Sequence, residues 1–382
     1  DSMPTLYVAV TNHGFGHATR AASIAAEICR GCKAEGIPLT LIMATTAPKW
    51  LLDSYLKGEY IHRPVSFDVG VLQSDSLTMD KPATLKAVQD IQSKEDKLIA
   101  EEAAFLISAD VDLVLADIPP LMAKIAYEAK VPCWMMGNFG WDFIYRHWGE
   151  EDPAFWTVAD WIGDCCGHAE RTFRMPFHEE MSAMPNITDI GLTGGTPAYS
   201  ETHLRQLIQK DRYSKGQSLS QADIDALPDT EHTVLLTFGG LGLATIPYDA
   251  IHQFPDWQFV TFDRTAPELP NLYRVNDLAM RPVDWMIMCD RIFSKPGYST
   301  FAEACLLDKG VITITREGFA EAEILINGIQ DYAPHRIVEA QTFFNGDWSF
   351  LTDELLPPRK TQKLDKTGRE TIASTVIKRL NA

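Results

Sequence analysis

This sequence lacks long apolar runs and an excess of basic residues, and each absence excludes a class of partner. Its longest apolar runs, such as Val234–Phe238, are far shorter than the ~20 residues that cross a bilayer. The N-terminus also lacks a charged segment leading into a signal-like core. Lysine and arginine number 34 against 52 acidic residues, giving a net charge of -18 that repels nucleic-acid phosphates. We expect a cytoplasmic protein with no transmembrane segment and no nucleic-acid partner, and the charge still allows a small anionic ligand in a local pocket.

Cysteines are few, and their spacing indicates neither a disulfide framework nor a metal cluster. Seven is an odd number, and the seven are scattered, which is typical of free thiols in a reducing compartment. Cys29 and Cys32 form a C-x-x-C at the end of a predicted helix, whereas thiolates are stabilised at helix starts. Cys165, Cys166 and His168 have no fourth ligand at a suitable spacing. We therefore expect ordinary thiols and no metal site.

The first half of the chain alternates between strand and helix patterns. Apolar runs at 5–10 and 38–45 flank a helical pattern over 18–35, which makes a strand, helix, strand unit. Two further runs, 111–120 and 131–138, repeat the pattern around another helical stretch. Such units imply a parallel sheet with crossover helices.

A second alternating series follows a region rich in aromatic, proline and glycine residues. With 382 residues the chain exceeds what one core usually organises, so two domains are expected. The predicted fold class is α/β, with two Rossmann-like parallel-sheet domains facing a cleft. The predicted boundaries are a first domain at 1–195, a linker region at 196–230, a second domain at 231–364 and a C-terminal helix at 365–382.

The stretch "TNHGFGHATR", residues 11–20, directly follows the first predicted strand. Gly14 and Gly16 let the backbone turn sharply and approach a ligand. His17 lies at the start of a helix, where the dipole keeps the imidazole neutral and able to act as a general base. His13 is the alternative base, and a simple turn capped by the histidines is the alternative to any function. The stretch has neither the lysine and hydroxyl of a P-loop nor the three-glycine dinucleotide spacing.

Two further strand ends, both in the second series, suit an anion. Gly239 and Gly240 follow a strand, so their amides can approach a phosphate or sugar, although a flexible turn fits equally. In "SKPGYSTFAEA", Lys295 lies just before a helix predicted to begin at about Ser299 or Thr300, and hydroxyls, free N–H groups and a cation together suit a diphosphate. Glu303 either accepts hydrogen bonds from a ribose or complements the helix dipole.

The motifs "GFGHATR", "LLTFGGLG" and "SKPGYSTFAEA" together resemble glycosyltransferases of the GT-B fold. This class includes the enzyme that adds N-acetylglucosamine to the lipid-linked peptidoglycan precursor. A closer similarity is to the glycosyltransferase-like N-terminal half of plant-type L-arabinokinases and their bacterial relatives, through "FDVGVLQSDSLTMD", "DLVLADIPP" and "NFGWDFIY". The resemblance covers Leu6 to about Glu321. No Gly- and Ser-rich ATP loop of the kinase half is present, so sugar kinase activity is not implied.

The resemblance implies an acceptor domain at 1–195, a nucleotide-sugar donor domain at 231–364, and a role for each motif residue. His17 would face the acceptor and the transferred sugar. Glu321, in "REGFAE", would contact the donor sugar, unless it is an exposed loop carboxylate. The donor nucleotide would be held in the second domain, with Glu303 on the ribose and Lys295 added from its charge. The donor set is Gly239, Gly240, Leu241, Lys295, Gly297, Tyr298, Ser299, Thr300 and Glu303.

The segment "NFGWDFIY" follows a first-domain strand and suggests an acceptor pocket. Asn138, Trp141 and Asp142 could build it, with the indole packing on a sugar ring, although Trp141 and Phe139 also fit the core. Asp142 and Asp117 are stronger candidates, because an unpaired carboxylate at a strand end is costly to bury. Asp142 therefore joins His17 and His13 as a catalytic candidate, and Asp117 joins the acceptor set with Gly14 and Gly16.

These expectations combine into sugar transfer from a nucleotide-diphosphate donor, a UDP-sugar, to an acceptor hydroxyl of a small molecule or glycan. No metal is expected, because helix dipole and side chains handle the leaving charge in this fold, and no cofactor is expected beyond the donor as co-substrate. A nucleotide-sugar epimerase of the same fold and a non-catalytic sugar or nucleotide sensor are the alternatives. The sequence indicates neither the stereochemical outcome nor the oligomeric state.

Overall fold

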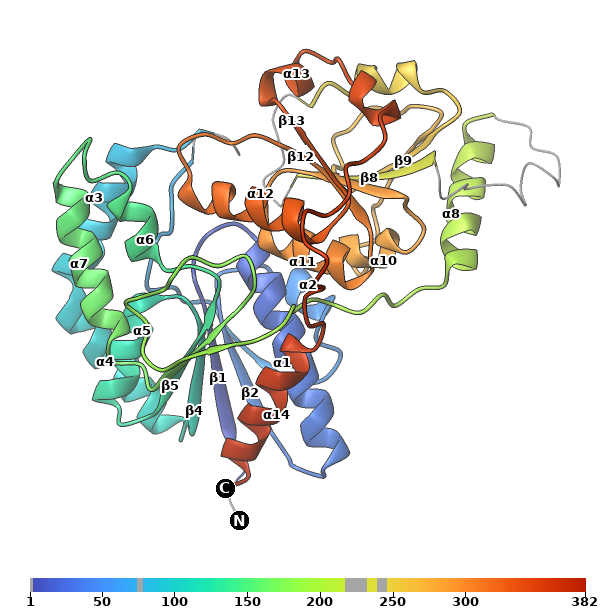
Figure 1. The fold of residues 1–382 in the computed structure, drawn as a ribbon. Coiled ribbons are helices and arrows are strands. Elements are labelled where there is room, and N and C mark those ends of the chain that lie inside the picture. The colour runs from blue at the N-terminus through green and yellow to red at the C-terminus, as the bar shows by residue number, and fades with distance from the viewer. Residues whose placement is uncertain (1–2, 74–77, 217–231, 239–245) are drawn as a thin grey trace. The chain divides into compact units, whose positions relative to one another are not determined.

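The computed structural model describes residues 3–73, 78–216, 232–238 and 246–382 of the chain. These residues form two compact units (Figure 1). The first comprises Asp1–Gly194, Gly318–Ile324 and Leu364–Ala382, and the second comprises Gly195–Glu317 and Leu325–Lys363. The first unit therefore contains two short segments from late in the sequence, one of which is the start of a helix discussed below.

The first unit is built on a seven-stranded parallel sheet in the order β3-β2-β1-β4-β5-β6-β7. The residues of β1, β4 and β5 are buried throughout, as expected for parallel strands covered by helices on both faces. This explains why the sequence shows continuous apolar runs here rather than alternation. The strands are β1 (Thr5–Val10), β2 (Thr40–Ala44), β3 (Ile61–Arg63), β4 (Leu113–Asp117), β5 (Cys133–Gly137), β6 (Arg171–Arg174) and β7 (Ile187–Asp189).

Helices of the first unit cover this sheet, and the last helix of the chain packs along the first (Figure 1). Gly31 permits that approach, because a Cβ there would lie 2.4 Å from the Ile377 side chain. The helices are α1 (Gly16–Ala34), α2 (Lys49–Asp53), α3 (Lys81–Ser93), α4 (Glu95–Ser108), α5 (Pro120–Glu128), α6 (Trp141–Arg146), α7 (Ala154–Cys166) and α14 (Gly368–Leu380).

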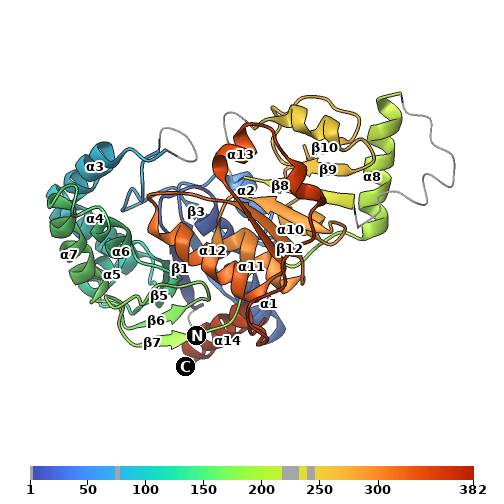
Figure 2. The same ribbon diagram turned by 45° about the horizontal axis from the view of Figure 1, so that its top comes forward.

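The second unit contains a six-stranded parallel sheet in the order β10-β9-β8-β11-β12-β13, and Figure 2 shows β10, β9 and β8 side by side. The two predicted Rossmann-like parallel sheets are thus confirmed. The strands are β8 (Thr233–Thr237), β9 (Gln258–Thr261), β10 (Leu272–Arg274), β11 (Arg291–Ser294), β12 (Gly310–Ile314) and β13 (His335–Val338). The helices are α8 (Glu201–Ser214), α10 (Pro282–Met286), α11 (Tyr298–Leu306), α12 (Ala320–Tyr332) and α13 (Ala340–Phe344), with 3-10 turns η2 (Tyr248–Gln253) and η3 (Ser349–Thr352).

Both sheets reverse their strand order at one point, between β1 and β4 in the first unit and between β8 and β11 in the second. In open α/β sheets ligands bind outside the carboxyl ends of the strands at such a point.

Helix α1 begins at Gly16, two residues earlier than predicted, so His17 lies in its first turn. Helix α11 begins at Tyr298, with Gly297 as its N-cap, rather than at Ser299 or Thr300.

Candidate functional site

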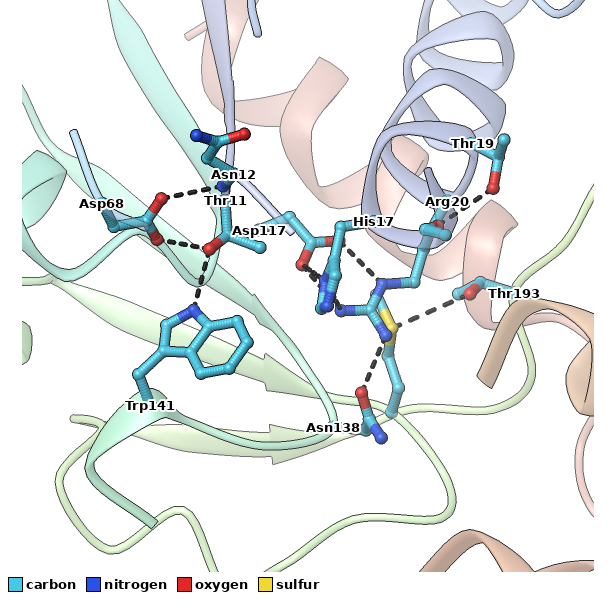
Figure 3. A network of polar contacts seen from close by, with 12 residues as sticks. Thr11, Asn12, His17, Thr19, Arg20, Asp68, Asp117, Asn138, Trp141 and Thr193 are labelled. Carbon is cyan, nitrogen blue, oxygen red and sulfur yellow. Dashed lines mark hydrogen bonds and ion pairs between the residues drawn. The ribbon is translucent and has the colours of Figure 1, made fainter. Parts of the chain in front are cut away.

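A buried polar network lies at the β1/β4 reversal of the first unit (Figure 3). Thr11 follows β1, Asp117 is the last residue of β4, and Asn138 follows β5. His17 and Arg20 come from the first turns of α1. Segments more than a hundred residues apart thus meet because the carboxyl ends of parallel strands share one edge of the sheet.

Asp117 is the centre of this network and is fully buried. Arg20 binds it through two atoms, with Nε donating to Oδ2 at 2.7 Å and Nη2 donating to Oδ1 at 2.6 Å. The Nδ1 atom of His17 lies 2.9 Å from the same Oδ1. Burial alone would raise the pKa of Asp117, but the charge of Arg20 and the hydrogen bonds from Arg20 and His17 outweigh that effect and hold the pKa below its ordinary value.

The contact with Asp117 decides which ring nitrogen of His17 carries the proton. A carboxylate oxygen at 2.9 Å can only accept, so Nδ1–H donates to it and Nε2 keeps its lone pair. Arg20 Nη2 is also 3.1 Å from Nδ1, but a guanidinium nitrogen is only a donor, so the carboxylate is the acceptor for the Nδ1 proton. Among the described residues no hydrogen bond uses Nε2 of His17. This nitrogen is therefore available to accept a proton from a hydroxyl.

The backbone that follows Asp117 is strained. Ile118 has φ of 57°, a left-handed conformation that is an outlier for a β-branched residue, and Pro119 follows it. Gly137 makes room for it, because a Cβ at Gly137 would lie 2.6 Å from Ile118 Cγ2. Strain of this kind persists only when the surroundings fix it, and it gathers at functional sites. Its position next to Asp117 favours a functional role for that carboxylate.

Asn138 links Arg20 to Glu321. Its Oδ1 accepts from Arg20 Nη1 at 2.8 Å, and its Nδ2 donates to Glu321 Oε2 at 2.9 Å. Asn138 is fully buried, and Glu321 lies partly buried in the first turn of α12, within the part of that helix that belongs to the first unit. The alternative of an exposed loop carboxylate is therefore wrong for Glu321.

Trp141 belongs to the core rather than offering an open face to a sugar. It is 1% exposed, its Nε1 donates to Thr11 Oγ1 at 2.8 Å, and its ring lies 5.0 Å from that of Phe139. Of the two interpretations of Trp141 and Phe139, the structure supports the core position and corrects the sugar-packing one. Thr11 in turn donates to Asp68. Loss of hydration of the carboxylate on burial raises the pKa of Asp68 to about 6.

His13, the alternative base, is held away from the carboxylate that orients His17. Its Nδ1 accepts from the Val71 amide at 3.4 Å and its ring stacks on Phe319 at 6.1 Å, whereas His17 contacts Asp117 directly. Gly14 has φ of +57°, and no atom of the described residues lies within 4 Å of a Cβ placed there, so these residues leave the turn before α1 open. The geometry favours His17 over His13.

Asp142 lies with a second acidic residue, Glu179, rather than with Asp117. It is 6% exposed in the first turn of α6, burial raises its pKa, and its Oδ1 has no partner among the described residues. Burial, and then the charge of Asp142, raise the pKa of Glu179 to about 8, and Glu179 Oε1 also lacks a described partner. The structure thus does not bring Asp142 into the His17 network.

In the second unit the predicted diphosphate segment lies at the N-terminus of α11. Gly297 caps the helix, Ser299 and Thr300 are partly buried in its first turn, and Lys295 is partly buried just before it. Tyr298 is 6% exposed, so its ring packs inside and only its backbone N–H belongs to the helix terminus.

Glu303 is 5% exposed, and its Oε2 accepts from the Gly195 amide at 2.8 Å. One oxygen of the predicted ribose contact is therefore already used. The first donor loop, Gly239, Gly240 and Leu241, lies outside the described residues.

The sequence missed Arg20, Thr11 and Asp68. Arg20 had one usable signal, its position three residues after His17, which places both on one face of a helix. Asp68 is more than fifty residues from Thr11 in sequence, and only the fold brings them together.

Within the described ranges no group of three or more His, Cys, Asp or Glu side chains is arranged to hold a metal ion. In the same ranges no helix has the length and apolarity needed to cross a membrane.

Comparisons with known proteins identify the fold. No protein-family model matches the chain. The chain is 26% identical to the L-arabinokinase of Arabidopsis thaliana over 351 residues, which cover 89% of this chain but only 31% of that protein. Arabidopsis thaliana UGT89C1 superposes with a TM-score of 0.61 at 12% identity over the whole of both chains.

Phytolacca americana UGT2, solved with UDP-2fluoro-glucose and pterostilbene, superposes with a TM-score of 0.57 at 12% identity over 99% of this chain and 94% of its own. The chain therefore has the GT-B glycosyltransferase fold. The resemblance to L-arabinokinase expected from the motifs is confirmed over most of the chain.

Proposed function

We propose that this protein transfers a sugar from a nucleotide-diphosphate donor, a UDP-sugar, to a hydroxyl of a small-molecule or glycan acceptor. The observation that carries the proposal is the buried contact of His17 with Asp117 at the β1/β4 reversal. It supplies an oriented base where this fold class binds ligands. Structural neighbours solved with UDP-L-rhamnose and with UDP-2fluoro-glucose support the donor class.

In the proposed reaction His17 Nε2 takes the proton of the acceptor hydroxyl as its oxygen attacks the anomeric carbon. The bond from that carbon to the diphosphate breaks, and the diphosphate leaves with the electron pair. Asp117 holds the ring in the required tautomer and stabilises the imidazolium that forms. Charge on the leaving group is met by N–H groups of the α11 terminus, Gly297 to Thr300, and by Lys295. No step requires a metal ion.

The remaining candidates take supporting roles in this proposal. The open turn at Gly14 and Gly16 admits the acceptor, and Asn138 orients Glu321 toward the donor sugar. Glu303, whose Oε2 accepts from the Gly195 amide, is assigned to the ribose. Gly239, Gly240 and Leu241 complete the donor loop. All seven cysteines are free thiols, which agrees with a reaction in a reducing compartment such as the cytoplasm.

A thermal-shift screen with nucleotide diphosphates and their sugars tests the donor class. A ligand at 100 times its Kd should stabilise the protein by about 2.7 kcal/mol. We expect UDP and a UDP-sugar to raise the melting temperature, and transfer to appear only when an acceptor is added. Isomerisation of the donor without acceptor would indicate an epimerase, and binding without turnover of any donor and acceptor pair would indicate a sensor. No shift with any nucleotide would contradict the donor assignment.

A further inference from the structure

Arg20 is a charged group of the buried network to which the proposed reaction gives no task. It is 4% exposed, one turn after His17 on α1, where a charged side chain would ordinarily point to solvent. Its Nε and Nη2 atoms donate to Asp117 and its Nη1 atom donates to Asn138, with Nη2 also 3.1 Å from His17 Nδ1. Burying a guanidinium this deeply is costly unless the arrangement it stabilises is needed.

The charges in this network explain what Arg20 adds. A buried carboxylate next to an imidazole favours the imidazolium, because the opposite charge is close and water is absent. An imidazolium at rest has no lone pair on Nε2 and cannot act as a base. Arg20 shares the same carboxylate through both of its oxygens, so the charge of Asp117 is already balanced before His17 takes up a proton. Its fork also fixes the rotation of the carboxylate that orients the ring.

We propose that Arg20 is a positioning residue that keeps His17 uncharged at rest and holds Asp117 at the angle at which it selects the Nδ1–H tautomer. The catalytic meaning of this device rests on the proposed transfer reaction. Its physical content does not, because the protonation of His17 in the folded protein can be measured without any substrate.

Other charged groups also face His17 and must be considered with Arg20. Asp68, on the loop after β3, interacts electrostatically with His17, and the His13 ring lies 6.3 Å away in the turn before α1. Glu321 of α12 is connected through Asn138, and Asp142 lies beside Trp141, whose ring centroid is 6.3 Å from that of His17. Among these groups Arg20 supplies the fixed positive charge, so its removal should change the protonation of His17 in one direction.

The test is an NMR titration of protein labelled with ¹⁵N in its histidine side chains. The His17 signal is the one that is absent from the spectrum of H17Q. In R20Q we expect His17 to remain protonated to a pH higher by about one unit or more than in the parent chain. In R20K the charge remains, so we expect the midpoint to stay within about 0.3 pH unit of the parent. Arg30 is an exposed arginine on the same helix, and R30Q is the matched control, with no shift expected.

Turnover separates positioning from charge. R20K cannot form the fork, so we expect kcat to fall about tenfold or more with donor Kd unchanged. In R20Q we expect the acid limb of the kcat/KM profile to move to higher pH along with the His17 signal. A folded R20Q whose His17 midpoint equals that of the parent would overturn the charge role, and an R20K with full kcat would overturn the positioning role.

If R20Q does not fold, R20K still tests the proposal. A shift of one pH unit in the His17 titration midpoint of R20K, which keeps the positive charge, would show that this charge does not determine the protonation of His17. If no transfer reaction is found, the NMR result stands by itself, so failure of the proposed function and failure of the Arg20 role are distinguishable.

Discussion

The strand-order reversals of the two sheets have the same topology but different chemistry. At the β1/β4 edge the functional groups are buried side chains that bind one another, with His17, Arg20 and Asp117 in one network. At the β8/β11 edge the candidate groups are mainly backbone, the N-terminus of α11 after a glycine cap. The first arrangement can move a proton, and the second can hold an anion. Two sheets of the same topology can therefore present different chemistry at their carboxyl edges.

The largest effect should come from removing the charge at the centre of the first network. In D117N the Arg20 guanidinium is left buried without its partner, and breaking a buried pair costs about 3–5 kcal/mol. We expect the free energy of unfolding, measured by urea denaturation, to fall by that amount. D90N, at an exposed pair on α3, is the control and should change stability by less than about 0.5 kcal/mol. Equal effects of the two substitutions would show that the network does not support the fold.

Adding one methyl group at each edge should separate the two kinds of site. In G137A the new Cβ would lie 2.6 Å from Ile118, so we expect a loss of about 1–3 kcal/mol from overpacking. In G297A the nearest atom of the described residues, the Lys295 carbonyl oxygen, is 4.0 Å from the new Cβ, so stability should be kept while the methyl group blocks the approach of a phosphate to α11.

Denaturation midpoints and UDP binding by calorimetry measure both effects. G58A is the control: no atom of the described part of the chain lies within 4 Å of a Cβ built at Gly58, so we expect neither stability nor UDP affinity to change. Unchanged UDP affinity in G297A would contradict an anion site at α11.

A smaller effect is expected on the pH dependence of stability. Burial and the charge of Asp142 raise the pKa of Glu179 to about 8, above its value in the unfolded chain. The native state therefore holds a proton that the unfolded state releases, so this contribution is present at acid pH and is lost as pH rises to about 8. Between pH 5 and pH 8.5 the free energy of unfolding should fall less in E179Q than in the parent chain, by on the order of 1 kcal/mol. Melting temperatures measured across this pH range show the difference. E150Q, at an exposed glutamate, should keep the parent slope.

The sequence predicted the sheets well because parallel strands are buried on both faces and appear as unbroken apolar runs. It also placed His17, Asp117 and Asn138 at or near strand ends, and the structure brings their side chains together because the carboxyl ends of parallel strands share one edge. It could not predict Arg20, because an arginine on a helix ordinarily faces solvent and only the buried Asp117 makes its burial favourable. Nor could it decide between the two interpretations of Trp141, whose environment depends on Thr11 and Asp68 from distant segments.

The central claim is that His17 is the base of a sugar transfer from a UDP-sugar, and one comparison tests it most directly. UDP release and product formation are measured in the parent chain and in H17Q with the same donor and acceptor, together with donor Kd. General base catalysis typically contributes about 10²- to 10⁴-fold, so we predict a loss of kcat in that range with donor Kd unchanged. H147Q, at an exposed histidine, is the control and should retain full activity. Undiminished transfer by H17Q would contradict the account.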